Sequence, residues 1–146
     1  MILIAYDGSD DAKPAARAAG ELFPGQPATV VHVFVKFSST RMATRTGIKV
    51  LVDADAADAA QLEDATEIAK EGAELALAGG LASAKPLAVP ADPDIAETIL
   101  AEADKLDARA IVIGSRGLST LAALLLGSAA NAVVHHSDRP VVVVPA

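Results

Sequence analysis

Five short apolar runs, separated by segments long enough for a helix, constrain the fold of this chain more than any other feature. The runs are residues 1–6, 28–37, 85–89, 111–113 and 141–144. Strands that alternate with helices of crossover length form a parallel sheet with helices on both faces. We therefore predict an α/β fold with a single doubly wound, parallel, five-stranded sheet of strand order 3-2-1-4-5. Open sheets of this kind bind ligands where the strand order reverses, here between the first and fourth strands.

Length and composition indicate one domain over residues 1–146. Hydrophobic residues make up 52% of the chain but aromatic residues only 3%, so Val, Ile, Leu and alanine-faced helices are expected to form the core. The formal net charge of −7 argues against nucleic acid and anionic membranes as partners. The absence of cysteine excludes disulfides and thiolate metal sites. The first apolar run is too short to be an export signal or a membrane span, so a cytoplasmic location is expected.

A glycine-containing loop follows the fourth apolar run and leads into a predicted helix over residues 129–136. It contains Gly114 and Gly117, then nine residues, then Gly127 and Ser128. Glycines let the backbone approach a ligand closely, and a helix N-terminus offers unpaired N–H groups with a favourable dipole. Ser128 can add a hydroxyl, and Arg116 either adds a positive charge or points into solvent. The spacing matches neither the dinucleotide fingerprint nor the P-loop, so we predict a phosphate site of another type.

Asp7 comes directly after the first strand, at the edge of the sheet where ligands bind. A carboxylate there suits sugar hydroxyls, an adenine amine or a metal ion. The alternative is that Asp7 or Ser9 only caps the next helix. His32 lies within a β-branched run of the second strand, and we expect it to be a hydrogen-bonded structural residue rather than a ligand.

The glycine spacing, with the tail over residues 131–145, resembles the nucleotide-binding branch of the universal stress protein family. The resemblance covers nearly the full length and implies an adenine-nucleotide α-hydrolase-like fold. It implies that Asp7 lies against the nucleotide and that the backbone of Val33, which follows His32, reads the adenine edge. The expected nucleotide-binding residues are Ala5, Asp7, Val33, Ile113, Gly114, Arg116, Gly117, Gly127, Ser128 and Ala129.

This resemblance implies an ATP-binding, cytoplasmic, homodimeric sensor or regulator of the stress response, with Mg²⁺ or Mn²⁺ beside the phosphates. A homodimer through the last strand, residues 141–144, would cover an apolar edge that otherwise favours aggregation. We expect no enzymatic activity beyond slow ATP hydrolysis, because the sequence places no general base near the phosphates. Two alternatives remain open: a member that binds AMP or a cyclic nucleotide, and a dimeric interaction scaffold without a nucleotide.

Local signals predict where the helices begin. The first helix is expected over residues 10–22, and Pro14 favours a late start or a kink. The second is expected to begin near residue 53, with its acidic residues solvated rather than bound to a metal. Asp92 is expected to be the N-cap of the third helix, with Pro93 in the first helical position.

Helical spacing also predicts which side chains are buried. Leu62 on the second helix, Ile95 on the third and Val134 on the fourth are expected to face the core. Residues 38–49 are polar and mildly basic, which predicts either a surface insertion or a lid whose arginines reach a triphosphate.

Overall fold

The computed structural model describes residues 1–36, 54–117 and 126–146, and within them it confirms the predicted α/β architecture. The strands are β1 (Ile2–Ala5), β2 (Pro27–Phe34), β3 (Ser83–Pro90), β4 (Ile111–Gly114) and β5 (Val141–Val144). The helices are α1 (Lys13–Leu22), α2 (Ala54–Ala78), α3 (Ile95–Lys105) and α4 (Ser128–His136). The sheet order is β3-β2-β1-β4-β5, and every pairing in it is parallel.

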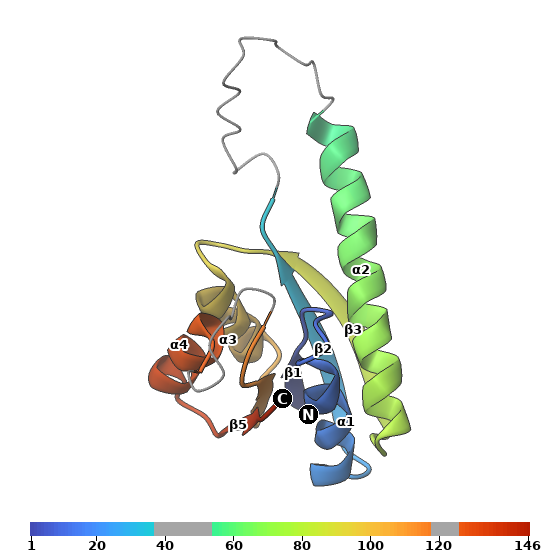
Figure 1. The fold of residues 1–146 in the computed structure, drawn as a ribbon, viewed down its shortest axis with the longest axis vertical. Coiled ribbons are helices and arrows are strands. Elements are labelled where there is room, and N and C mark those ends of the chain that lie inside the picture. Colours follow the sequence, from blue (N-terminus) through green and yellow to red (C-terminus); the bar gives the residue numbers. More distant parts are fainter. Residues whose placement is uncertain (37–53, 118–125) are drawn as a thin grey trace.

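The sheet separates two layers of helices, with α1 and α2 on one face and α3 and α4 on the other (Figure 1). Strand β1 shows why both faces are covered. Its side chains alternate, so that Ile2 and Ile4 enter the core beneath α1 and α2, while Leu3 and Ala5 enter the core beneath α3 and α4. Each face of this strand is therefore buried, as expected of a central parallel strand.

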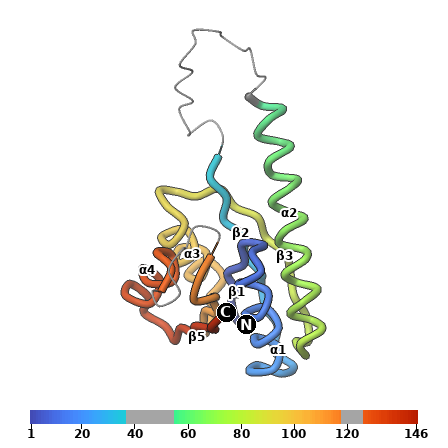
Figure 2. The backbone as a smooth tube through the Cα atoms, viewed as in Figure 1, coloured from blue at the N-terminus to red at the C-terminus, as the bar shows by residue number. Residues whose placement is uncertain are grey.

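The carboxyl ends of β1, β2 and β4 lie on the same side of the sheet, because these neighbouring strands run parallel. Figure 2 shows β1 beside β2. Ala5 is in register with Val31 of β2 and with Ile113 of β4. The loops after β1 and β4 therefore begin side by side, although they are far apart in the sequence, and β2 continues beside them to Phe34. This is the point at which the strand order reverses.

Helix α1 meets the C-terminal end of α2 at two glycines, Gly20 within α1 and Gly79 directly after α2. A Cβ atom at Gly20 would lie 2.3 Å from the carbonyl carbon of Gly79, and one at Gly79 would lie 2.4 Å from the carbonyl oxygen of Arg17. Glycine is therefore required on both sides of the contact, because the obstructing atoms are backbone.

Two helix starts differ in detail from their predictions. Helix α1 begins at Lys13, with Pro14 in its first turn, where a missing N–H costs no intrahelical hydrogen bond. Helix α3 begins at Ile95, and its N-cap is Asp94 rather than Asp92. The Asp94 carboxylate accepts a hydrogen bond from the backbone N–H of Glu97 (2.9 Å). Pro93 therefore precedes the helix, because the aspartate that follows it supplies the cap.

Three predicted core positions are wrong. The side chains of Leu62, Ile95 and Val134 are 46%, 38% and 41% exposed. Leu62 lies in the N-terminal half of α2, which extends past the end of the sheet (Figure 1). Its neighbour Gln61 already bonds to the carbonyl of Val35, beyond the last residue of β2. Helical periodicity predicts the direction in which a side chain points, but not where the helix extends beyond the sheet on which it packs.

The predicted insertion or lid over 38–49 lies outside the described residues, as does most of the loop between Gly117 and Gly127. None of the described helices is long and apolar enough to cross a membrane.

Candidate functional site

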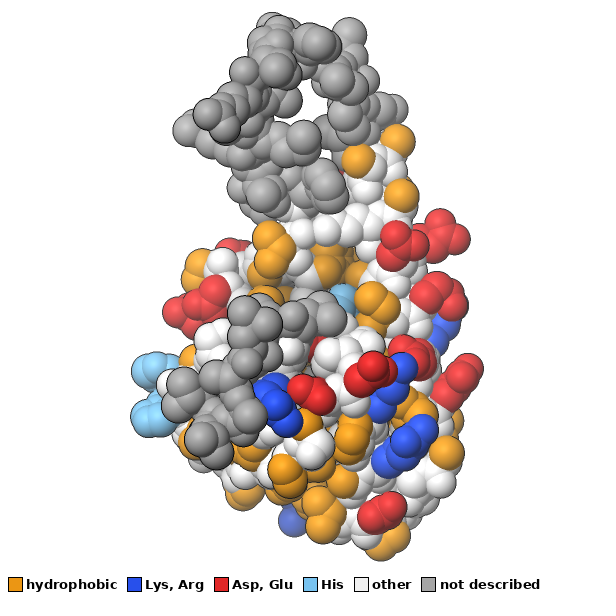
Figure 3. All heavy atoms as spheres, in the orientation of Figure 1, with side chains coloured by type: hydrophobic (Ala, Val, Ile, Leu, Met, Phe, Trp, Pro, Cys, Tyr) orange, Lys and Arg blue, Asp and Glu red, His pale blue; other side chains and the backbone are white. Residues whose placement is uncertain are grey.

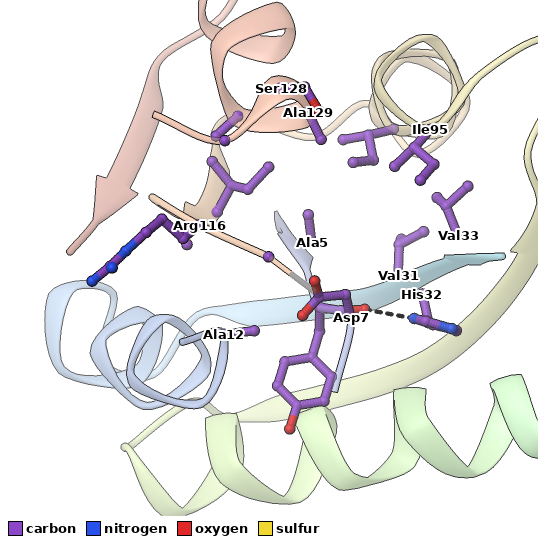
Figure 4. Close-up of a pocket in the computed structure, with 17 residues that line it drawn as sticks. Ala5, Asp7, Ala12, Val31, His32, Val33, Ile95, Arg116, Ser128 and Ala129 are labelled. Carbon is purple, nitrogen blue, oxygen red and sulfur yellow. Dashed lines mark hydrogen bonds between the residues drawn. The ribbon is translucent and has the colours of Figure 1, made fainter. Parts of the chain in front are cut away.

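A cavity of about 180 Å³ opens at the edge of the sheet where β1, β2 and β4 end. Its wall contains each of the ten residues selected from the sequence: Ala5, Asp7, Val33, Ile113, Gly114, Arg116, Gly117, Gly127, Ser128 and Ala129. Figure 4 shows Ala5, Val33 and Ser128 around the same space. These residues come from six separate elements or loops, and the sheet order brings them together.

One end of the cavity is formed by the start of α4. Gly127 is buried at the N-cap, where no side chain caps the helix, and its own N–H donates to the carbonyl of Ser115 (2.7 Å). The first backbone bond of the helix runs from the N–H of Asn131 to the carbonyl of Gly127 (2.8 Å). The N–H groups of residues 128–130 therefore have no acceptor within the helix. Since these residues line the cavity, this end is suited to an anion.

Asp7 occupies the loop after β1, beside the glycine loop. Its Oδ1 accepts hydrogen bonds from the backbone N–H of Ser9 (3.0 Å) and from the Ser9 hydroxyl (2.6 Å). Ser9 Oγ in turn accepts from the N–H of Ala12 (3.1 Å), just before α1. The other carboxylate oxygen lies so close to Gly117 that a Cβ there would be 2.6 Å from it. Asp7 thus organises its own loop and also lines the cavity, but it does not cap α1, whose N-cap Ala12 has no side-chain cap hydrogen bond.

His32 ties the ends of β1 and β2 together next to the cavity. Its Nδ1 donates to the carbonyl oxygen of Tyr6 (2.9 Å), and the Tyr6 N–H donates to the carbonyl of Val31 (3.0 Å). His32 is only 7% exposed, so it is the hydrogen-bonded structural residue predicted from the sequence. Burial, followed by the nearby Glu71 carboxylate, raises the pKa of Tyr6, and its phenol stays protonated at neutral pH.

The opposite end of the cavity is apolar. Its wall includes Val31 and Val33 from β2, Ile113 from β4, and Ile95 and Ile99 from the first turns of α3. Ile95 was expected in the core; it instead faces this opening, which accounts for its exposure. A flat, largely apolar group such as a nucleobase fits between such side chains.

Seven residues line the cavity without having been selected from the sequence: Tyr6, Ala12, Val31, His32, Ile95, Ile99 and Ala130. Tyr6, Val31, His32 and Ala130 lie within two residues of a selected residue, so widening the selected set by two positions would have found them. Ala12, Ile95 and Ile99 carried no such signal, because the positions of α1 and α3 over the sheet depend on tertiary packing.

The charged group of Arg116 lies away from the middle of the cavity. Its side chain points toward the start of α1 (Figure 4), and its Nε is 3.6 Å from Asp11 Oδ2. Elsewhere on the visible face, acidic and basic side chains alternate along α1 and α2 (Figure 3). There Lys13 pairs with Asp10 (3.2 Å) and with Glu71 (3.5 Å). In the described part of the chain, no three His, Asp or Glu side chains are grouped to hold a metal ion.

The family model of the universal stress proteins matches residues 1–145. The chain belongs to the universal stress protein family. Comparison with curated proteins gave no match.

Solved structures of other universal stress proteins share the fold. One from Archaeoglobus fulgidus is 26% identical, with a TM-score of 0.66 over 97% of this chain and 96% of that one. UspA from Lactobacillus plantarum is 23% identical, with a TM-score of 0.68 over 98% and 95%. A universal stress protein solved in complex with cAMP is 22% identical, with a TM-score of 0.69 over 99% and 94%. The two structures that are less than 25% identical to this universal stress protein show only that it has the fold of the family.

Proposed function

We propose that this universal stress protein binds ATP, with Mg²⁺ or Mn²⁺, in the cavity at the reversal of the strand order. The observation that carries the proposal is the division of one cavity into an apolar end and an end lined by N–H groups that have no acceptor within α4. The adenine would lie between α3 and the end of β2, where the backbone of Val33 is available to its edge. The ribose would lie near Asp7 and Gly114, and the phosphates on Gly117, Gly127, Ser128 and the N–H of Ala129.

The residues present fit a nucleotide with a bound cation better than a bare triphosphate. The phosphate end offers backbone donors, and the one cationic side chain among the described lining residues, Arg116, is paired with Asp11. The Asp7 carboxylate beside Gly117 would repel phosphate oxygens at close range. A divalent cation would offset this repulsion, and oxygen ligands from phosphates and a carboxylate are the type that Mg²⁺ prefers.

The same charge balance supports the second candidate, a nucleotide with fewer charges such as AMP or a cyclic nucleotide. The similar universal stress protein in complex with cAMP makes this candidate concrete. A nucleotide-free scaffold is less well supported, because the N–H groups at the start of α4, which have no acceptor within that helix, and the apolar wall would then face one another across a cavity without a ligand.

We propose that the protein acts as a cytoplasmic sensor or regulator in the stress response rather than as an enzyme. Among the described residues that line the cavity, His32 lies on β2, away from Ser128 at the phosphate end (Figure 4), and the tyrosine has a raised pKa. The Asp7 carboxylate already accepts two hydrogen bonds from Ser9, so at most slow hydrolysis is expected.

Calorimetric titration with ATP, ADP, AMP and cyclic AMP, each with and without Mg²⁺, tests the proposal. The expected result is binding of ATP that strengthens with Mg²⁺ and exceeds the binding of the other three. Tighter binding of AMP or cyclic AMP would select the second candidate. Absence of binding for every nucleotide would contradict the proposal and leave the scaffold.

We also propose that the active form is a homodimer through β5. Its four valines are only half-buried at the edge of the sheet. The other edge, β3, contains Pro86 and Pro90, which have no N–H to offer, and α2 packs on it. β4 bonds to the carbonyls of Pro140 and Val144, so the backbone groups of Val141 and Val143 point away from it.

Sedimentation velocity of two variants at the same position tests the dimer. Val143→Pro removes an outward N–H and is expected to give monomers, whereas Val143→Thr keeps both the N–H and the shape of the side chain and is expected to remain dimeric. A monomeric wild-type protein, or a dimeric Val143→Pro variant, would contradict pairing through β5.

A further inference from the structure

We propose that Asp11 sets the phosphate preference of this site by holding Arg116 away from the phosphate tail of the nucleotide. The inference rests on the proposed function and concerns a residue outside the cavity wall. Asp11 acts through Arg116 and is therefore a positioning residue. It lowers the affinity for ATP relative to AMP, because only the longer phosphate tail would gain from a free guanidinium.

The first support is the position of Arg116 in the chain relative to the phosphate end. The carbonyl of its neighbour Ser115 accepts a hydrogen bond from the N–H of Gly127 (2.7 Å). Gly127 is the N-cap of α4, so the backbone of Arg116 lies next in the chain to a residue that is bonded to the start of this helix. Arg116 lines the same cavity as Gly127 and Ser128. An arginine side chain is long enough to turn from this position toward an anion on the helix N-terminus.

The second support is the direction that the side chain takes instead. Arg116 points toward the start of α1, and its Nε lies 3.6 Å from Asp11 Oδ2 (Figure 4). The side chains of the two residues are 29% and 39% exposed, so solvent screens the pair only in part. The pair joins the loop after β1 to the loop after β4.

The third support is that Asp11 is held in place by its surroundings. A Cβ at Gly114 would lie 3.1 Å from the carbonyl oxygen of Asp11, so the two loops are in close backbone contact. The next residue, Ala12, donates its N–H to Ser9. Asp11 also precedes the first residue of α1, where the helix dipole favours a negative charge.

Asp10 provides a matched control for the loss of a carboxylate. It is the preceding residue, its side chain is 97% exposed, and it pairs with Lys13 rather than with Arg116. Asp10→Asn removes the same charge from the same loop and leaves Arg116 in place. It therefore separates the release of Arg116 from a general reduction of negative potential near the site.

The test measures the ratio of ATP to AMP affinity by calorimetry, at fixed Mg²⁺ and ionic strength, in the wild-type protein and five variants of the full chain. Asp11→Asn is expected to raise the ratio about fivefold, while Asp10→Asn changes it less than about twofold. Arg116→Gln alone is expected to leave the ratio within about twofold of wild type, but to abolish the gain when added to Asp11→Asn. Asp11→Glu, which keeps the carboxylate, is expected to retain the wild-type ratio.

Several outcomes would overturn the inference. An equal effect of Asp11→Asn and Asp10→Asn would show only general repulsion. A fall of about fivefold in the ratio for Arg116→Gln in the wild-type background would show that Arg116 already serves the phosphates, and this arm decides even if Asp11→Asn does not fold. Absence of nucleotide binding in the wild-type protein would overturn the proposed function as well, whereas wild-type binding with an unchanged ratio in Asp11→Asn overturns this inference alone.

Discussion

Replacing Gly117 by valine is expected to lower the affinity for ATP at least about 100-fold and to leave the fold intact. A Cβ at this position would lie 2.6 Å from Asp7 Oδ2, and the next nearest atom is the Asp7 carboxyl carbon at 3.7 Å. Both belong to the end of one side chain, so Asp7 can turn aside and the chain can still fold. The valine would then occupy the phosphate end of the cavity and displace the carboxylate from the ribose. The loss of two charge-assisted hydrogen bonds accounts for an effect of this size.

Ser115→Val is the control for this prediction. It adds the same branched side chain to the same loop, but Ser115 is not part of the cavity wall. Calorimetry gives the affinities, and circular dichroism verifies that each variant is folded. ATP binding by Gly117→Val within about tenfold of the Ser115→Val control would show that the phosphates lie elsewhere.

Replacing Gly20 by alanine is expected to destabilise the protein by about 2 kcal/mol. The added Cβ would lie 2.3 Å from the carbonyl carbon of Gly79, 2.6 Å from its Cα and 2.7 Å from the carbonyl oxygen of Ala76. These are backbone atoms of α2 and of the residue that follows it, so α1 and α2 must move apart. Overpacking of this kind costs about 1–3 kcal/mol, and a forced backbone shift belongs at or above the upper end. Alanine recovers about 1 kcal/mol through its helix propensity.

Glu21→Ala is the matched control, because it introduces alanine at the adjacent, exposed position of α1. Urea denaturation at one protein concentration gives the free energy of unfolding of each variant. Gly79→Ala is expected to destabilise similarly, since its Cβ would meet the carbonyl oxygen of Arg17. A Gly20→Ala variant as stable as Glu21→Ala would show that the two helices are not in contact through these glycines.

The sheet and the wall of the cavity could be predicted from the sequence because both depend on order along the chain. Crossover segments between apolar runs imply parallel strands, and residues at the carboxyl ends of such strands or just after them must gather on one side of the sheet. Asp7, Val33 and Gly114 therefore needed no knowledge of side-chain packing to be placed together. The glycine spacing then indicated which helix start would face them.

The details that sequence reasoning missed depend on tertiary contacts. Asp94 rather than Asp92 caps α3. The sequence did not distinguish them, because an aspartate stands on each side of Pro93 and either could have served as the cap. Arg116 was left as a phosphate ligand or a solvated residue, and the structure pairs it with Asp11, whose position no local pattern encodes. Leu62 lies on the expected helix, but in the part of it that extends past the end of the sheet. In each case the sequence indicated what the residue type can do, but not which residue it contacts in the fold.

The most direct test of the central claim is to map ATP binding on the backbone amides of the wild-type protein by NMR. Titration with ATP and Mg²⁺ is expected to shift the amide resonances of Asp7, Val33, Gly117, Ser128 and Ala129, which lie around the cavity at the carboxyl edge of the sheet. The amides at the opposite edge, such as those of Gln26 and Arg109, are expected to remain unchanged. Shifts confined to that opposite edge, or no shifts at millimolar ATP, would contradict the account.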